Sequence, residues 1–327
     1  MKDLVQNFAN QLKEAIQIGS NAQFTLPANP LHQVVVTGLG GSGIGGTIMS
    51  EIVAQECAIP VLVNKDYFLP AFVNKHTLVI VSSYSGNTEE TLQALDQALA
   101  KGAKIVCITS GGKVADIARE KKLDLVIIPG GMPPRSCLGY SLTQLFYAMK
   151  GMQLISANFE AALKKAIALI EAEDKNIKAE ALSITDVLFK KTPVIYAVDG
   201  FNGVATRFRQ QINENSKMLC WHHIIPEMNH NELVGWAEMH PEAAVVILRN
   251  KEDYSRSQAR IEISKEVFAM RNASITEIWS KGDSMIERSI YLVYLTDWIS
   301  CYLADKKAID PVEVDIINHL KGSLAKI

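Results

Sequence analysis

The chain has 327 residues, of which 48% are hydrophobic and 21% charged, a composition typical of a globular protein of about two domains. Its 33 lysines and arginines nearly balance 35 acidic residues. The resulting net charge of −2 excludes a broad basic surface for nucleic acid or an anionic membrane. We therefore expect a small ligand that is recognised locally.

An amphipathic helix is predicted at the start of the chain, with Leu4, Phe8 and Leu12 on one face. Apolar segments of strand length then alternate with helical patterns, which favours a mostly parallel sheet with helices on both faces. The predicted strands of this first half cover residues 34–36, 60–63, 78–81, 105–108 and 125–128.

Residues 142–189 have an almost continuous helical pattern, which predicts a bridge between two halves. A second alternation follows, with predicted strands at 194–198, 244–248 and 275–279. We predict two doubly wound parallel-sheet α/β domains, residues 1–152 and 153–327. Two such units can hold a ligand between them, at the carboxyl ends of their strands.

The stretch TGLGGSGIGG follows the first predicted strand and opens a helix. Gly38, Gly40 and Gly43 fit the G-x-G-x-x-G pattern, in which glycines let the backbone approach a phosphate at a helix N-terminus. Any phosphate ester can use this geometry. A dinucleotide would also need an acidic residue at the end of the second strand. Glu56 precedes that strand and Asp66 follows it too late, so a nucleotide is not favoured.

A second loop, SSYSGNTEET, follows the third predicted strand and opens the next helix. Residues 87–90 resemble a capping box. The hydroxyls of Ser83, Ser85 and Thr88 gather at the same helix N-terminus. Hydroxyls, backbone N–H groups and the positive end of the helix dipole together favour a phosphate.

These two loops together resemble the sugar isomerase (SIS) domain, an α/β fold that binds phosphosugars. Two later stretches, PGGMPPRSCLGYS and NENSK followed by PEMNHNELVGW, are similar to the bifunctional phosphoglucose/phosphomannose isomerase family. The resemblance spans nearly the whole chain. It implies SIS-type domains with flanking helices and a C-terminal helix that folds back over the cleft. It also implies isomerisation of fructose 6-phosphate with glucose and mannose 6-phosphates, without a cofactor.

The resemblance also implies roles for individual residues. An enediol reaction needs a base, groups that open the sugar ring and a cation facing the enediolate. Glu214 resembles the catalytic base, and Arg135 is suited to stabilise the enediolate. His230 and Lys321 resemble the residues that open the ring, with His230 reaching the site from a neighbouring subunit.

The binding residues implied by the resemblance come from the first half. The glycines of the first loop are expected to make room for the sugar. The hydroxyl that is proposed to let the family accept both C2 epimers has no counterpart near Val312. The expected contacts are Ser83, Ser85 and Thr88 with the phosphate, Gly40, Gly41 and Ser42 near the ring, and Pro134 in the wall of the pocket.

Three other classes of protein share parts of this pattern. A metal enzyme could start from histidines 222, 223, 230 and 240, but their spacing gives neither an H-x-x-x-H face nor a typical carboxylate arrangement, so we expect no metal. A noncatalytic phosphosugar sensor could discard Glu214, His230 or Lys321, whose joint presence favours an enzyme. An isomerase acting on another sugar phosphate stays open.

The cysteines and the length of the apolar segments indicate the compartment and the partners of the protein. Five scattered cysteines without a C-x-x-C pair indicate reduced thiols and a cytoplasmic protein. No segment approaches the roughly 18 apolar residues of a membrane span, so no membrane partner is expected. The resemblance implies a homodimer, because His230 would complete the site of the other subunit.

Overall fold

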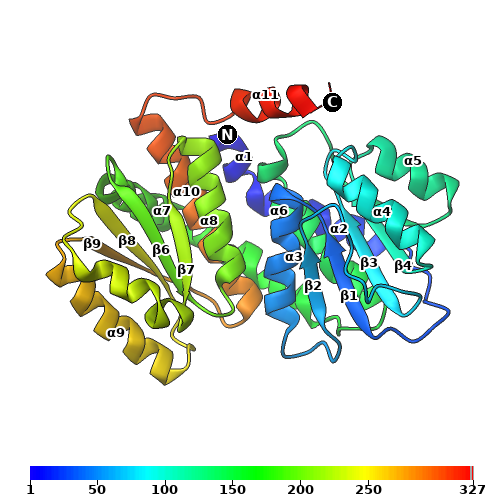
Figure 1. Ribbon diagram of the computed structural model, residues 1–327, viewed down its shortest axis with the longest axis horizontal. Helices are drawn as coiled ribbons and strands as arrows, with labels where there is room; N and C mark the ends of the chain where they lie inside the picture. The colour runs from blue at the N-terminus through cyan, green and yellow to red at the C-terminus, as the bar shows by residue number, and fades with distance from the viewer. Residues whose placement is uncertain (325, 327) are drawn as a thin grey trace.

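The computed structural model describes residues 1–324 and residue 326, which form two α/β halves lying side by side (Figure 1). Over these residues the first half holds five parallel strands in the order β2-β1-β3-β4-β5, and the second holds four in the order β7-β6-β8-β9. In each sheet the chain starts at an inner strand and winds outward in both directions, as doubly wound folds do. The predicted fold class is confirmed.

All eight predicted strands are present, with ends that differ by at most two residues. A further strand, β7, joins the edge of the second sheet and was not predicted. The strands are β1 (Gln33–Thr37), β2 (Val61–Asn64), β3 (Thr77–Ser82), β4 (Lys104–Thr109), β5 (Asp124–Ile127), β6 (Thr192–Val198), β7 (Trp221–Ile225), β8 (Ala243–Arg249) and β9 (Ser274–Trp279).

The helical segment predicted over residues 142–189 is broken at residues 152–157 into two helices. Within the described residues, no helix is both long and apolar enough to cross a membrane. The helices are α1 (Lys2–Gln6), α2 (Phe8–Asn21), α3 (Gly40–Val53), α4 (Glu89–Ala100), α5 (Gly112–Glu120), α6 (Leu138–Gly151), α7 (Asn158–Leu188), α8 (Asn202–Ser216), α9 (Ser255–Met270), α10 (Met285–Lys306) and α11 (Asp315–Leu324), with short 3-10 turns η1 (Pro134–Ser136), η2 (Glu227–His230) and η3 (Glu232–Ala237).

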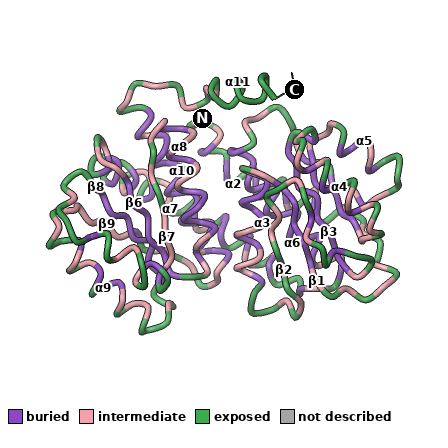
Figure 2. The backbone as a smooth tube through the Cα atoms, in the orientation of Figure 1, coloured by how far each residue is buried: buried purple, intermediate pink, exposed green. Residues whose placement is uncertain are grey.

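One hydrophobic core runs through both halves. Alternate side chains of a strand point to opposite faces of the sheet, so Val34 and Val36 of β1 pack in this core while Val35 packs in a separate core with α4 and α5. The shared core also contains inward faces of α2, α3, α6, α7, α8 and α10 and one face of the second sheet. Figure 2 shows it as buried backbone in the centre of both halves. The two sheets are therefore held in a fixed relation by packing.

Helices α3 and α8 pack antiparallel where the halves meet. A Cβ atom on Gly203, at the start of α8, would lie 2.7 Å from Ile48. Both carboxylate oxygens of Glu51, near the end of α3, accept a hydrogen bond from the Gly203 N–H at 3.0 Å. Burial raises the pKa of Glu51 to about 7, partly opposed by this hydrogen bond. Because the start of α8 lies at the end of α3, its last turn lies near the loop that precedes α3.

Helix α11 forms a separate layer above the junction of the two halves (Figure 1), as the prediction of a C-terminal helix over the cleft requires. Its ten described residues include no buried side chain, and Figure 2 shows the helix as exposed. Ile316 is 86% exposed and Leu320 58%. The position of α11 is therefore set by the segment that leads to it.

Candidate active site

The glycine loop sits at the carboxyl end of β1, and most of its glycines make room for the chain itself. A Cβ atom on Gly38 would lie 2.5 Å from the Ser82 carbonyl oxygen, and one on Gly43 would lie 2.2 Å from the Gly38 carbonyl oxygen. A Cβ atom on Gly41 would lie 2.8 Å from the Pro134 carbonyl oxygen. At these three positions the missing side chain therefore makes room for main-chain atoms of the protein itself, and the expected contact of Gly41 with the sugar stays a prediction.

Gly40 is different. Its φ of +52° lies in the left-handed region that glycine adopts without strain. A Cβ atom built here would meet no heavy atom of the described chain within 4 Å. Gly40 thus leaves open space at the start of α3, where an anion or sugar could approach the helix N-terminus.

The serine loop follows β3 and is tied to the glycine loop. The Tyr84 N–H donates to Ser42 Oγ at 3.0 Å, so the two loops are fixed side by side. Ser83 Oγ donates to Thr88 Oγ1 at 3.2 Å, and the Asn87 N–H donates to Ser85 Oγ at 3.3 Å. Ser83 is buried, whereas Ser85 is exposed. The predicted hydroxyl groups are therefore gathered at the start of α4.

The capping box predicted at residues 87–90 is wrong. Helix α4 begins at Glu89, with Thr88 as its N-cap residue. The Asn87 side-chain oxygen accepts instead from the Lys113 N–H of α5 at 3.1 Å. The amide of Asn87 therefore joins two neighbouring turns at the sheet edge and leaves the first turn of α4 unblocked by its side chain.

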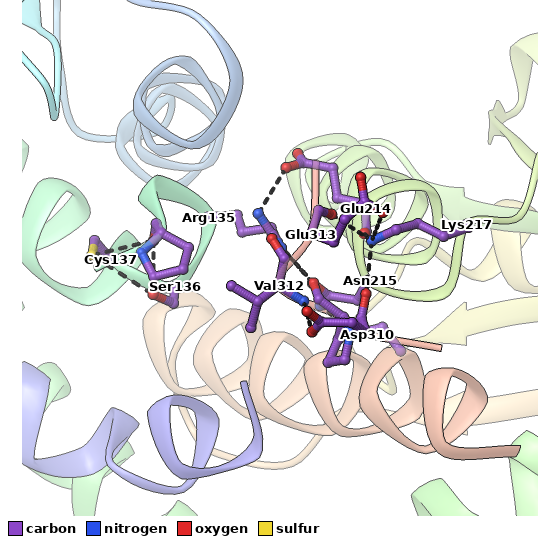
Figure 3. A network of polar contacts seen from close by, with 12 residues as sticks. Arg135, Ser136, Cys137, Glu214, Asn215, Lys217, Asp310, Val312 and Glu313 are labelled. Carbon is purple, nitrogen blue, oxygen red and sulfur yellow. Dashed lines mark hydrogen bonds and ion pairs between the residues drawn. The ribbon is translucent and has the colours of Figure 1, made fainter. Parts of the chain in front are cut away.

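Arg135 lies in η1, directly after the carboxyl edge of the first sheet, and is 5% exposed. Its Nε donates to Asn215 Oδ1 at 2.7 Å, and one terminal nitrogen contacts Glu214 Oε2 at 3.3 Å. The other terminal nitrogen donates to the carbonyl oxygens of Pro311 and Val312. Burial lowers the pKa of the guanidinium from its ordinary value, and Glu214 opposes this shift. Figure 3 shows the guanidinium facing these acceptors.

Glu214 lies in the last turn of α8, with a side chain that is 29% exposed. The sequence predicts a site at the carboxyl ends of the strands of both sheets. Because α8 returns antiparallel to its strands, Glu214 instead comes from the amino-end side of the second sheet. The antiparallel packing of α3 and α8 brings this side next to the glycine loop. The second half is therefore inverted relative to the first at the site.

A buried ion pair supports the backbone of Arg135. Arg207 of α8 donates to Asp297 Oδ2 of α10 at 2.6 Å, and both side chains are less than 10% exposed. The same Arg207 nitrogen atom donates to the Arg135 carbonyl oxygen at 3.0 Å. Gln211 donates to the other Asp297 oxygen at 2.9 Å. These contacts fix the turn that presents the guanidinium.

Asn215 orients the guanidinium itself. Its amide oxygen accepts from Arg135 while its Nδ2 donates to Ser300 Oγ at 3.0 Å. The sequence analysis missed Arg207, Gln211 and Asn215. The signal that could have revealed them is their spacing of four residues, which places three polar side chains on one helix face. That face meets α10 in the core.

Lys321 lies on α11 and is exposed. A cavity of about 340 Å³ separates α11 from the end of α8, and Glu214 forms part of its wall. The cavity is lined by Asn213, Glu214, Lys217, Met218, Leu219, Glu313, Val314, Ile316 and Ile317. Lys321 thus belongs to the helix that roofs the Glu214 side of the cleft.

His230 does not join this group within one chain. It is the last residue of η2 and is exposed. The turn follows the carboxyl end of β7, whereas Glu214 lies at the amino-end side of the same sheet. Helix α8, which spans that distance, has 15 residues and is about 22 Å long at 1.5 Å per residue. The structure therefore unites Arg135 and Glu214 with the two loops and leaves His230 at the opposite end.

Two of the histidines considered for a metal site form contacts with other side chains. His222 Nε2 contacts Thr206 Oγ1 at 2.9 Å on α8, and His223 Nδ1 contacts Glu232 Oε2 at 2.7 Å in η3. Burial lowers the pKa of His222 to about 4. Among the residues that the structure describes, no group of three or more His, Cys, Asp or Glu side chains is arranged to hold a metal ion.

Comparison with known families matches each half of this architecture. Residues 31–149 match the SIS domain, and residues 177–324 match the bacterial phospho-glucose isomerase C-terminal SIS domain. The C-terminal domain of glucosamine-fructose-6-phosphate aminotransferase from Francisella tularensis has the same fold, with a TM-score of 0.76 at 14% identity over 95% of this chain and 97% of that chain. The fold and its loops define a protein of two SIS domains.

Relatives with higher sequence identity show which family of two-domain SIS proteins the chain belongs to. The bifunctional phosphoglucose/phosphomannose isomerase of Caldicellulosiruptor bescii is 40% identical over 340 aligned residues, which cover 100% of this chain and 99% of that protein. The Aquifex aeolicus protein of the same name is 34% identical over 91% of this chain and 92% of its own length. The chain belongs to the bifunctional phosphoglucose/phosphomannose isomerase family. The predicted family is confirmed, while the boundary between residues 152 and 153 stays a prediction.

Proposed function

We propose that the protein is an aldose–ketose isomerase that interconverts fructose 6-phosphate with glucose 6-phosphate and mannose 6-phosphate. Membership of the family supports this activity. The observation that carries it is the contact of 3.3 Å between Arg135 and Glu214 beside the glycine loop. The carboxylate can act as the base, and the guanidinium beside it can act as the cation that an enediolate reaction needs.

The proton transfer follows from this pair. In the open-chain aldose, the Glu214 carboxylate removes the proton from C2, and the electrons of that bond form the enediolate. Return of the proton to C1, with transfer of the hydroxyl proton from O2 to O1, gives the ketose. Arg135 keeps its charge throughout and stabilises the oxygen on which negative charge develops. Loss of configuration at C2 allows two aldose epimers to share one ketose.

The two loops of the first half would hold the rest of the substrate. The hydroxyls of Ser83, Ser85 and Thr88 and the start of α4 offer neutral donors and a positive dipole end to the phosphate. Gly40 leaves open space at the start of α3. Gly41, Ser42 and Pro134 adjoin it and are proposed to line the sugar.

Ring opening is assigned to Lys321 and His230. Lys321 lies on the helix above Glu214, and His230 lies at the far end of its own domain. We therefore propose a homodimer in which His230 completes the site of the partner subunit. The exposed position of His230 supports this assembly. The five free cysteines favour a cytoplasmic setting.

A coupled assay tests the proposal. Purified protein is given fructose, glucose or mannose 6-phosphate, and product formation is measured with and without a chelator. We expect turnover of all three sugars that survives chelation. Tight binding of the phosphosugars without turnover would instead identify a sensor, and turnover of only a different sugar phosphate would reassign the substrate.

A further inference from the structure

The segment between α10 and α11, residues 307–314, is here called the strap. It leads from the shared core to the helix that carries Lys321 (Figure 1). Since α11 buries no side chain among its described residues, the strap decides where this helix lies. The contacts that hold the strap therefore determine where Lys321 stands relative to Glu214.

Two cations hold the strap through its carbonyl oxygens. Arg135 donates to the oxygens of residues 311 and 312. The Lys217 ammonium donates to the carbonyl oxygens of Asp310 at 3.1 Å and Glu313 at 2.7 Å. Four successive carbonyl groups of the strap are thus bound by two side chains, and Figure 3 shows the contacts of both.

Lys217 also binds the catalytic helix. Its third hydrogen bond, of 2.6 Å, goes to the carbonyl oxygen of Glu214 at the end of α8. An ammonium has three donors, and all three are used here on main-chain oxygens. One side chain thus ties the end of the helix that carries the proposed base to residues 310 and 313 of the strap.

The backbone of Lys217 has a conformation that glycine adopts more easily. Lys217 is the residue after α8, with φ +50° and ψ +46° in the left-handed region. Glycine is the usual residue there, because it adopts this conformation without a Cβ atom. A glycine would end the helix as well but would supply no ammonium to the strap.

We propose that Lys217 is a positioning residue that clamps the strap to the end of α8 and so sets Lys321 above Glu214. The inference rests on the proposed isomerase function. Lys217 itself reaches main-chain oxygens only, apart from Glu313 Oε2 at 3.9 Å. It therefore acts through Lys321 and Glu214.

The test compares Lys217→Met with Lys217→Arg and with a control. Methionine keeps an unbranched stem of similar length but removes the ammonium. The control is Lys191→Met, which removes an ammonium that donates to the Pro241 carbonyl oxygen in the same half. We expect Lys217→Met to lower kcat at least tenfold while the inhibition constant of inorganic phosphate changes less than twofold. Lys217→Arg should restore most of the activity, and the control should match the wild type.

A double-mutant cycle with Lys321→Met decides whether the clamp acts through α11, because residues that act as one unit are not additive. We expect Lys217→Met to cause less than a twofold further loss of kcat once Lys321 has been replaced. An equal loss in both backgrounds would overturn the proposal, as would a single variant with kcat within twofold of wild type.

Hydrogen exchange separates this proposal from the proposed function. In Lys217→Met, amides 310–324 should exchange at least tenfold faster than in the wild type, while those of α10 are unchanged. Unchanged exchange in this segment would refute the clamp whatever the activity. If the wild type isomerises no phosphosugar but the exchange increases as expected, the clamp stands and the function fails.

Discussion

Replacement of Glu51 by glutamine should change how the stability of the protein depends on pH. The Glu51 carboxylate is the contact between α3 and the start of α8, and burial raises its pKa from 4.5 to about 7. A raised carboxylate pKa means that the folded protein binds the proton more tightly than the unfolded chain. The contribution to stability is therefore full below pH 4.5 and is lost as the pH rises through 7.

The size of the effect follows from the shift. A change of about 2.5 pH units at 1.36 kcal/mol each corresponds to about 3 kcal/mol between pH 4.5 and 8. An unfolding entropy of about 2.1 cal/mol/K per residue gives about 1.5 °C per kcal/mol for a chain of this length. The wild type should therefore lose about 4–5 °C in Tm relative to Glu51→Gln over this range, since the amide still accepts from the Gly203 N–H but has no charge to bury.

The assay is thermal unfolding of wild type and Glu51→Gln at half-unit steps from pH 4.5 to pH 8. Glu266→Gln, an exposed glutamate on α9, is the matched control for loss of one negative charge. We expect the Tm curves of wild type and Glu51→Gln to diverge as the pH rises, with the variant more stable at pH 8. A difference in Tm that stays constant across the range would refute the reasoning.

Two further predictions concern the supports of the site. Arg135→Lys should lower kcat about 100-fold, because a single ammonium cannot replace a planar fork of donors at an anion. The same change at the exposed Arg119 should have no effect. A near-normal kcat in Arg135→Lys would show that Arg135 takes no part in the mechanism. Asp297→Ala should lower the free energy of unfolding in urea by about 3–5 kcal/mol, because the Arg207 guanidinium would be left buried without a carboxylate partner. The exposed change Asp305→Ala should cost less than about 1 kcal/mol, and equal losses for the two variants would contradict the buried pair.

The first sheet was predictable because its three inner strands, β1, β3 and β4, are buried on both faces. Such strands form continuous apolar segments between turns, and residues 78–81 are fully buried. The strand β7 was missed because its sequence, WHHII, begins with partly exposed aromatic and polar residues. An edge strand of this kind has no distinctive apolar pattern, and it is recognised only through its pairing with β6.

The residues of the candidate site could be named from motifs, but their arrangement could not. No local pattern indicates that α8 runs back along α3, since this depends on the close approach of Gly203 to Ile48. That packing inverts the second half and brings Glu214 to Arg135. The contacts of Arg135 with residues 311 and 312 join segments about 180 residues apart, for which spacing gives no signal.

The roles of the glycines could be separated only with the structure. The sequence pattern treats Gly38, Gly40 and Gly43 alike. Two of them make room for main-chain atoms, and Gly40 alone of the three has open space where a side chain would be. The motif therefore predicts a tight strand-to-helix turn more reliably than it predicts which residue meets a ligand.

The central claim is that Glu214 is the base of a phosphosugar isomerase, and Glu214→Gln tests it most directly. The amide keeps the shape of the side chain and cannot accept a proton from carbon. We expect kcat with fructose 6-phosphate to fall by about 10²–10⁴, while calorimetry shows phosphosugar affinity within threefold of wild type. A variant that binds the sugar normally and retains wild-type turnover would contradict the account.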